Sequence, residues 1–266
     1  MSQNSSKINR LLKRWPRKTV AVQSWLSEVG VYRQLVAAYH KTAWLNRIGR
    51  GAFMRADDHI DWTGGLYAIQ TQMGLAIHAG GKTALQLQGY AHFLPLGTGM
   101  PISLFGLPEV KLPAWFRHGY DWGVEIDYFT TNLFSQNPST GLTHQHQETY
   151  DIVISSPERA IMEVLYLIPH KESFEEAKLL MEGLTTLRPR LVQSLLEMCH
   201  AIKVKRLFML LAEKCHHNWL EQLDLSKIDF GKGKRMIGEG GYFNAKYQIS
   251  VPDRQSVYEY QEQSFF

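Results

Sequence analysis

Residues 20–55 read VAVQSWLSEVGVYRQLVAAYHKTAWLNRIGRGAFMR, and this stretch decides the fold of the N-terminal part of the chain. Apolar residues recur at helical spacing from Val20 and Val22 to Val29 and again from Leu35 to Tyr39, with Gly30 between the two runs. Two short helices separated by a glycine turn are typical of a helix-turn-helix. The stretch therefore predicts this motif, with its second helix after Gly30.

The sequence on either side predicts one further helix and a β-hairpin. Apolar side chains from Ile8 to Trp15 share one helical face, and Pro16 ends that helix. At the other end, Gly49-Arg50-Gly51 lies inside residues 45–55 and permits the tight turn of a hairpin. Three helices followed by a basic hairpin make up a winged helix-turn-helix.

The positive charge of the chain is concentrated at its N-terminal end. Residues 1–55 hold eleven Lys and Arg against one acidic residue, Glu28. This net charge of +10, within a total of +4, leaves −6 on the other 211 residues. A basic head on a mildly acidic body indicates a surface that meets a polyanion. Because the head is also rich in Leu, Val, Ile and Trp, we expect it to fold rather than to be a solvated basic tail.

We expect the second helix of the motif to lie in the major groove of double-stranded DNA. Its first residues, Tyr32, Arg33 and Gln34, would reach the bases, since Arg pairs bidentately with guanine and Gln with adenine. Other side chains would contact the phosphates or the minor groove, which gives affinity and salt dependence but little sequence selectivity. The residues expected in this second role are Arg17, Lys18, Thr19, Lys41, Arg47, Arg50 and Arg55. A winged helix can instead bind a protein, and that alternative stays open.

The rest of the chain predicts a larger mixed domain, so that an α+β fold consists of residues 1–58 and 59–266. Strands are expected within 75–81, 101–107, 122–134, 149–155 and the tail 230–252. Helices are expected over 62–73 and 82–93, after Ser155, Ser173 and Pro189, and over 203–215. Ser155 with Glu158, and Ser173 with Glu176, are candidate capping boxes.

Composition and termini favour a cytoplasmic location. No run approaches the roughly 18 apolar residues of a membrane-spanning helix, and the first residues lack the apolar core of a signal peptide. The two cysteines, Cys199 and Cys215, do not make a disulfide framework and are expected to be reduced.

Two motifs suggest phosphate or metal chemistry. Gly80-Gly81-Lys82-Thr83 is similar to a phosphate-binding loop, but Ala76 stands where that pattern requires a glycine, so a structural turn is expected. Glu125 and Asp127 would share one face of a strand and could hold a divalent metal. A metal-dependent enzyme that processes nucleic acid, with the winged helix as its targeting module, is therefore the alternative function. No third carboxylate stands at a recognisable spacing.

The histidines and cysteines give no zinc signature. Cys199-His200 and Cys215-His216-His217 lack the C-x-x-C spacing, and His144 and His146 are placed in a polar loop. We expect no catalytic residue, no metal and no cofactor.

Two basic islands interrupt the acidic body. The glycines around the second island let backbone amides and cations approach a phosphate, so a second nucleic-acid surface is one interpretation and a solvated turn is the other. The residues of these islands are Lys203, Lys205, Arg206, Lys232, Lys234 and Arg235.

Five ordered segments resemble one known family. The chain is similar to the AbiE-type antitoxins of bacterial abortive infection, a phage defence that uses type IV toxin–antitoxin systems. The segments that carry the resemblance are LVAAYHKTAWLNRIGRGAFMR at 35–55, GGKTALQLQGYAHFLPLG at 80–97, ISSPERAIMEVL at 154–165, KVKRLFMLLAE at 203–213 and FGKGKRMIGEGGYFNAKYQISVP at 230–252.

The resemblance implies a function for each half of the chain. It implies a winged helix that represses its own operon by binding inverted repeats in the promoter, which places the protein at the bacterial nucleoid. It also implies a larger domain that neutralises a nucleotidyltransferase-like toxin without a stable complex. The resemblance carries the DNA-contacting role onto Arg33, Gln34, Arg47, Arg50 and Arg55. Ala37 and Ala38 stand where recognition helices of the family often carry basic residues.

Overall fold

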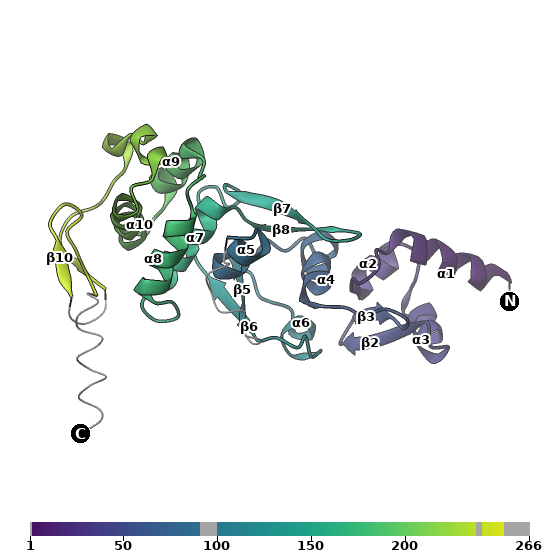
Figure 1. Ribbon diagram of the computed structural model, residues 1–266. Helices are drawn as coiled ribbons and strands as arrows, with labels where there is room; N and C mark the ends of the chain where they lie inside the picture. The colour runs from purple at the N-terminus through teal and green to yellow at the C-terminus, as the bar shows by residue number, and fades with distance from the viewer. Residues whose placement is uncertain (1, 91–99, 238–240, 253–266) are drawn as a thin grey trace, which may run out of the picture. The chain divides into compact units, whose positions relative to one another are not determined.

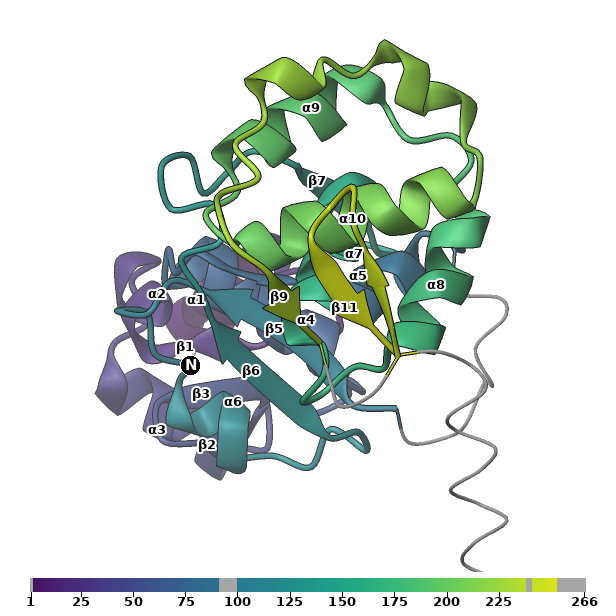
Figure 2. The ribbon, with the colours of Figure 1, turned by 90° about the vertical axis from the view of Figure 1, so that its left-hand side faces the viewer.

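The computed structural model describes residues 2–90, 100–237 and 241–252, and its helices and mixed sheets form an α+β fold, as predicted (Figures 1 and 2). The chain divides into two compact units. Unit 1 comprises residues 1–79, 97–131 and 143–154, and unit 2 comprises 80–96, 132–142 and 155–266. The N-terminal module and the sheet that follows it lie in the same unit. The domain boundary expected after residue 58 does not coincide with the division into units, and separate folding of residues 1–58 stays a prediction.

The N-terminal module of unit 1 has the expected order of three helices and a hairpin. Its elements are α1 (Ser2–Arg14), β1 (Ala21–Val22), α2 (Gln23–Glu28), α3 (Arg33–Lys41), β2 (Leu45–Gly49) and β3 (Ala52–Arg55). The three strands form an antiparallel sheet in the order β1-β3-β2. This is the arrangement of a winged helix-turn-helix.

The start of the second helix differs from the prediction. Val20 and Val22 were expected in that helix, but Ala21 and Val22 pair with Phe53 and Ala52 as a third strand of the hairpin sheet. A short apolar run suits a buried strand as well as a helix, and periodicity alone does not separate the two. The partner of this strand lies about thirty residues further along the chain, so no local signal reveals it.

One face of each helix and the inner side of the sheet form the core of the module. Trp15 is 1% exposed, and the spacing that predicted the first helix is confirmed by the burial of its apolar face. Burial of each large apolar side chain contributes about 1.5–3 kcal/mol. The core residues are Ile8, Leu11, Trp15, Ala21, Leu26, Val31, Val36, Tyr39, Leu45 and Phe53.

The module is joined to the rest of unit 1 by backbone contacts. α4 (Trp62–Tyr67) begins at Asp61, whose side chain accepts from the N–H groups of Thr63 and Gly64. A Cβ on Gly64 would lie 1.9 Å from the carbonyl oxygen of Lys18, so only glycine permits this approach. The side chain of Gln72, at the end of the π-helical turn Ala68–Gln72, accepts from Val22 N–H and donates to Val20 C=O.

The main sheet of unit 1 has five strands in the order β6-β5-β4-β8-β7. β4 pairs antiparallel with β5 and parallel with β8, and β5 pairs parallel with β6, as Figure 2 shows for β5 and β6. The strands are β4 (Ile77–Ala79), β5 (Ile102–Gly106), β6 (Ile126–Thr130), β7 (Leu142–His146) and β8 (Asp151–Ser155), and the short helix α6 (Ala114–His118) lies between β5 and β6 in the chain. Four of these strands fall inside the predicted ranges. β7 was not predicted, and His144 and His146 lie in it rather than in a loop.

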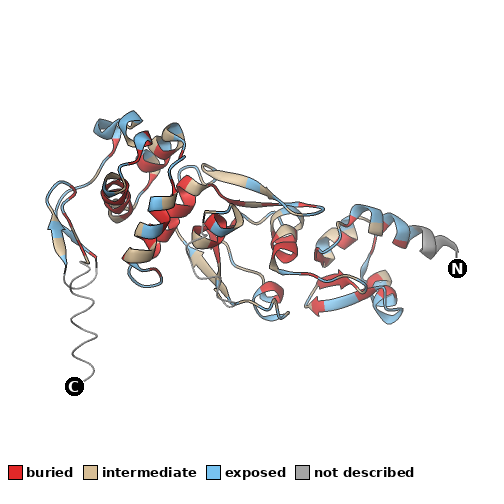
Figure 3. Ribbon diagram, viewed as in Figure 1, coloured by how far each residue is buried: buried red, intermediate tan, exposed pale blue. Residues whose placement is uncertain are grey.

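Unit 2 is mainly helical and ends in a small sheet. Its helices are α5 (Gly81–Leu87), α7 (Pro157–Leu167), α8 (Phe174–Gly183), α9 (Pro189–Met198), α10 (Ile202–Lys214) and the 3-10 turns Asn218–Gln222 and Leu225–Lys227. Its strands are β9 (Arg235–Met236), β10 (Tyr242–Asn244) and β11 (Ile249–Val251), in the order β10-β11-β9. α7 and α10 are buried over most of their length (Figure 3).

The two predicted capping boxes have different outcomes. Ser173 is the N-cap of α8 and accepts from Glu176 N–H at 3.1 Å, as predicted. The prediction for Ser155 was wrong, because α7 is preceded by Ser156 and the hydroxyl of Ser155 donates to Glu163 instead.

Candidate nucleic-acid interface

The second helix of the motif, α3, is buried on one face and open to solvent on the other. Val36 and Tyr39 are 3% and 5% exposed and pack into the module core. Tyr32, which caps the helix, is 66% exposed. The outward face, in pale blue in Figure 3, carries Arg33, Gln34, Ala37, Ala38, His40 and Lys41. The residues predicted to read bases are therefore brought together on one accessible face.

The turn before α3 holds this helix in place. Gly30 has a φ of +83°, a left-handed conformation that favours glycine. Its N–H donates to Ser27 C=O, and Val31 N–H donates to Leu26 C=O at 2.7 Å. This pair of hydrogen bonds is the Schellman motif that closes the end of α2. Because Val31 is also buried in the core, the direction in which α3 leaves the turn is fixed.

The hairpin of β2 and β3 presents two of its predicted cations. Arg47 and Arg50 are exposed, and the Arg47 Nε donates to Gly49 C=O at 3.1 Å. The turn closes at Gly51, with a φ of +75°, and Gly51 C=O accepts from Gln23 N–H at 2.8 Å. The hairpin is thus attached to the first residue of α2, and its arginines are held at a set position relative to the helix-turn-helix.

Arg55 does not lie on the surface, and its predicted contact with phosphate is wrong. It is 6% exposed, and its Nη2 donates to the carbonyl oxygens of Leu12, at 2.6 Å, and Trp15. Desolvation lowers the pKa of Arg55. The prediction treated the hairpin as two strands. β3 is instead the central strand of three, and all four of its residues are buried, with Arg55 lying against the end of α1.

The segment before β1 is also partly structural. Thr19 is fully buried and its hydroxyl donates to Pro16 C=O, so its predicted contact with DNA is wrong. Lys18 is exposed, and its Nζ lies 2.7 Å from Glu148. The hydrogen bond with that carboxylate raises the pKa of Lys18. Arg17 is exposed, with Asp57 at 3.7 Å. The ion pair of Arg17 with Asp57 is therefore longer than that of Lys18 with Glu148.

The first basic island is not a surface. The guanidinium of Arg206, 2% exposed, donates to the carbonyls of Phe230, Gly231, Gly233 and Gln248. Lys205, also buried, donates to Asp229 C=O. Lys203 donates to the carbonyls of Tyr166 and Ile168. These three cations hold backbone segments of unit 2 together, so the prediction for them was wrong.

The second island does lie on the surface. Lys232, Lys234 and Arg235 are exposed, and Lys234 Nζ lies 5.1 Å from the ring centroid of Phe243. Their role in binding nucleic acid stays a prediction.

The glycine loop before α5 has the structural role expected of it. Gly81 N–H, at the start of the helix, donates to the carboxylate of Glu163 at 3.0 Å. Lys82 forms ion pairs with Glu172 and Glu176. The amide and the cation that a phosphate-binding loop would offer both have carboxylate partners.

The structure brings no metal site together at the expected positions. Glu125 is exposed just before β6 and Asp127 is half-buried within it. Across residues 2–90, 100–237 and 241–252, no three His, Cys, Asp or Glu side chains lie close enough together to hold a metal ion.

Cys199 and His217 of unit 2 belong to its packing, whereas His200 and His216 are exposed. Cys199 is buried, which raises the pKa of its thiol to about 11. His217 stacks on Trp219 and lies 2.7 Å from Met181 C=O.

Comparisons with known proteins agree with this architecture. A family model described as "Transcriptional regulator, AbiEi antitoxin, Type IV TA system" matches residues 100–252. A second, described as "Transcriptional regulator, AbiEi antitoxin N-terminal domain", matches residues 4–96. None of the helices that the structure describes is both long and apolar enough to cross a membrane.

One solved structure shares the fold along nearly the whole chain. The crystal structure of the RV2827C protein from Mycobacterium tuberculosis is 13% identical, with a TM-score of 0.57 over 98% of this chain and 96% of that chain. Comparison with curated proteins gives no match. Because one family model covers more than half of the sequence and a second covers its N-terminal part, the chain belongs to the AbiEi family of antitoxins and transcriptional regulators of type IV toxin–antitoxin systems.

Proposed function

We propose that this protein represses its own operon by placing α3 in the major groove at inverted repeats of its promoter. The observation that supports this most is the exposed face of α3, which starts with Tyr32, Arg33 and Gln34 and is held by the Schellman turn at Gly30. The first residues of a recognition helix are the ones that reach base edges in helix-turn-helix proteins. Binding at promoter DNA would place the protein at the nucleoid.

The chemistry of this face favours base reading at its start and close approach along its length. Arg33 and Gln34 offer bidentate pairing to guanine and adenine, each worth about 1–3 kcal/mol of discrimination. Ala37 and Ala38, one turn further on, add no bulk and offer methyl groups to the methyl group of thymine. Lys41 follows on the same face and would contact phosphate. Arg47 and Arg50 would do the same from the hairpin.

The repressor role is tested by titrating fluorescent promoter DNA with the full chain at several salt concentrations. Binding that is saturable, favours the promoter over a scrambled duplex, and weakens steeply with salt supports the proposal. A duplex carrying a single half-site serves as the control for inverted repeats. The repressor role fails if promoter and scrambled DNA bind equally.

We further propose that the protein opposes a nucleotidyltransferase-like toxin without a stable complex, through residues outside the N-terminal module. The support is membership of a family of type IV antitoxins. Co-expression with the toxin encoded beside it tests this: growth is restored by the wild type and by Arg33→Ala, while Arg33→Ala no longer represses the promoter. The proposal fails if growth is not restored, or if the two proteins co-elute from a sizing column.

A further inference from the structure

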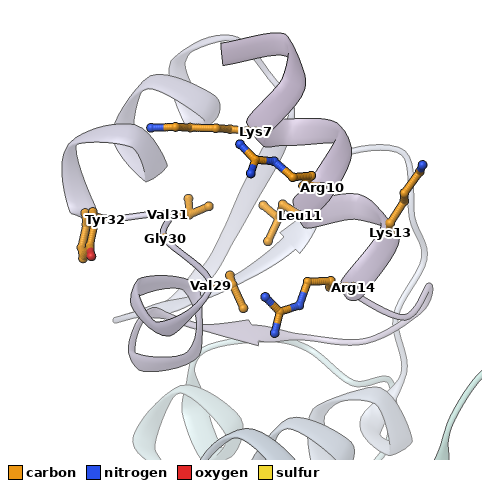
Figure 4. A pocket seen from close by; sticks show the side chains of 9 residues that line it. All are labelled: Lys7, Arg10, Leu11, Lys13, Arg14, Val29, Gly30, Val31 and Tyr32. Atoms are coloured by element: carbon orange, nitrogen blue, oxygen red, sulfur yellow. The ribbon is translucent and has the colours of Figure 1, made fainter. Parts of the chain in front are cut away.

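A hollow of about 550 Å³ lies beside the recognition helix, between α1 and the turn that joins α2 to α3 (Figure 4). We call it the α1 hollow; its lining includes the α1 cations Lys7, Arg10, Lys13 and Arg14, the apolar Leu11 and Val29, and Tyr32. Its volume lies in the range of pockets that take small organic groups, about 300–1,000 Å³. It therefore has room for a unit the size of a nucleotide.

Four cations of α1 line this hollow, and three of them share one helical face. Lys7, Arg10 and Arg14 stand three and four residues apart, which places them on one side of α1. Figure 4 shows their side chains on the side of α1 that faces the turn, whereas the side chain of Lys13 extends away from the others. All four are exposed.

α1 itself contains no acidic residue. Residues 1–27 contain no Asp or Glu, and the first acidic residue is Glu28. Like charges three and four residues apart destabilise a helix. An anion bound in the α1 hollow would relieve the repulsion.

The α1 hollow is also adjacent to the residues proposed to read bases. Tyr32 lines it and is the N-cap of α3, and Arg33 and Gln34 follow directly. When a recognition helix lies in a major groove, the phosphates of the two strands border it on either side. A phosphate seated beside Tyr32 therefore belongs to a strand that borders the groove.

We propose that the α1 hollow seats a stretch of the sugar–phosphate backbone of this strand. Lys7, Arg10 and Arg14 contact its phosphates, and Leu11 and Val29 contact the apolar edge of a deoxyribose. This inference rests on the proposed DNA-binding function and extends it, because these cations lie outside both the recognition helix and the hairpin. They fix the register of α3 on the DNA rather than the choice of bases.

The first test compares the salt dependence of DNA binding in two double variants of equal charge. Arg10→Gln/Arg14→Gln removes two proposed contacts, and Lys111→Gln/Arg190→Gln removes two exposed cations elsewhere. Each lost phosphate contact makes the slope of log K against log salt less steep by about 0.9, so the first variant loses about 1.8. If affinities converge at 1 M salt, this is a loss of roughly 60-fold at 0.1 M. The control variant keeps the wild-type slope. Arg10→Lys/Arg14→Lys preserves both charges, so it is expected to keep most of the wild-type slope as well.

The second test locates the phosphates. Promoter duplexes with one uncharged methylphosphonate linkage at a time are bound to the wild type and to Arg10→Gln/Arg14→Gln. We expect at least one linkage whose neutralisation weakens the wild type and the control variant but leaves the first double variant unchanged. The thermal unfolding temperature of both double variants is compared with that of the wild type, to confirm that they are folded.

The outcomes separate the α1 hollow from the function on which it rests. If the wild type shows no salt-sensitive preference for its promoter, both proposals fail. If it does, but the two double variants have the same slope and the same sensitive linkages, only the α1 hollow proposal is overturned. It is also overturned if ATP, tested by calorimetry, binds the wild type and not Arg10→Gln/Arg14→Gln while the slopes agree, because the hollow would then take a free nucleotide.

Discussion

The guanidinium of Arg55 lies over the indole of Trp15, 5.6 Å from the ring centroid, and donates a hydrogen bond to the carbonyl oxygen of the same residue. A second hydrogen bond reaches Leu12 C=O in the last turn of α1. Lys and Arg side chains often satisfy the free carbonyls at a helix C-terminus in this way. Arg55 thus links the central strand β3 to the C-terminal end of α1, the helix that carries the cations of the α1 hollow.

Replacement of Arg55 by Met is expected to lower the free energy of unfolding by about 2–3 kcal/mol, because buried carbonyls lose charge-assisted hydrogen bonds. Urea denaturation measures this. Arg47→Met, at an exposed hairpin position, is the control and is expected to stay within about 0.5 kcal/mol of the wild type. If Arg55→Met were as stable as the control but bound DNA with a less steep salt slope, Arg55 would be a phosphate contact after all.

Replacement of Gly30 by Ala is expected to destabilise the protein by about 1–2 kcal/mol. The cost comes from the backbone alone, since φ is +83° and a Cβ would meet nothing within 4 Å. Asn tolerates the left-handed region better, so Gly30→Asn is the matched comparison and loses less. Thermal unfolding of the three proteins checks the order. Equal stability of the Ala variant and the wild type would contradict the Schellman turn described before α3.

Replacement of Arg188 by Met is expected to destabilise unit 2 in a pH-dependent way. Burial pushes the pKa of Glu158 up, but hydrogen bonds from Arg188 hold it below its ordinary value. A lowered pKa stabilises the fold above the ordinary value of 4.5, and this is lost as the pH falls through the folded-state pKa. Without its partner the buried carboxylate has a raised pKa, so the variant is weakest near neutral pH.

We expect a loss of about 2 kcal/mol at pH 7, below the 3–5 kcal/mol typical of a fully buried pair, because Arg188 is exposed and its backbone N–H still donates to Glu158. Unfolding measured from pH 7 to pH 3 should show the difference from the wild type narrowing as the pH falls, first through the raised pKa of the variant and then through the lowered pKa of the wild type. Arg190→Met, an exposed neighbour in α9, is the control. A difference that is constant with pH would show that Glu158 does not titrate as described.

The N-terminal module was predictable because its signals are local. The helical faces of α1 and α3, the glycine turn and the hairpin each follow from residues close together in the sequence. Two of the errors there come from contacts between residues that are distant in the sequence. Residues 21–22 join the hairpin sheet from about thirty residues away, and Arg55 is buried against Leu12 and Trp15, which lie about forty residues earlier in the chain.

In unit 2, basic side chains were harder to place than apolar ones. Lys205 and Arg206 look solvated in the sequence, but carbonyl groups from residues 229–248 surround them, and nothing local predicts that return of the chain.

The strand β7 was missed because its residues, LTHQH, show neither apolar alternation nor enrichment in β-branched residues. The carboxylate of Glu163 accepts hydrogen bonds from Gly81 N–H and from Arg159. This role was not predicted, because nothing close to Glu163 in the sequence indicates that Gly81 lies beside it.

The central claim is that α3 reads bases while the hairpin contacts phosphates. The most direct measurement is the ratio of dissociation constants for scrambled and promoter DNA, at one salt concentration, for the wild type, Arg33→Ala and Arg50→Ala. Arg33→Ala is expected to lower this ratio by about 5- to 150-fold, which corresponds to 1–3 kcal/mol. Arg50→Ala should weaken binding to both duplexes and leave the ratio unchanged. An unchanged ratio in Arg33→Ala, or a lowered one in Arg50→Ala alone, would contradict the account.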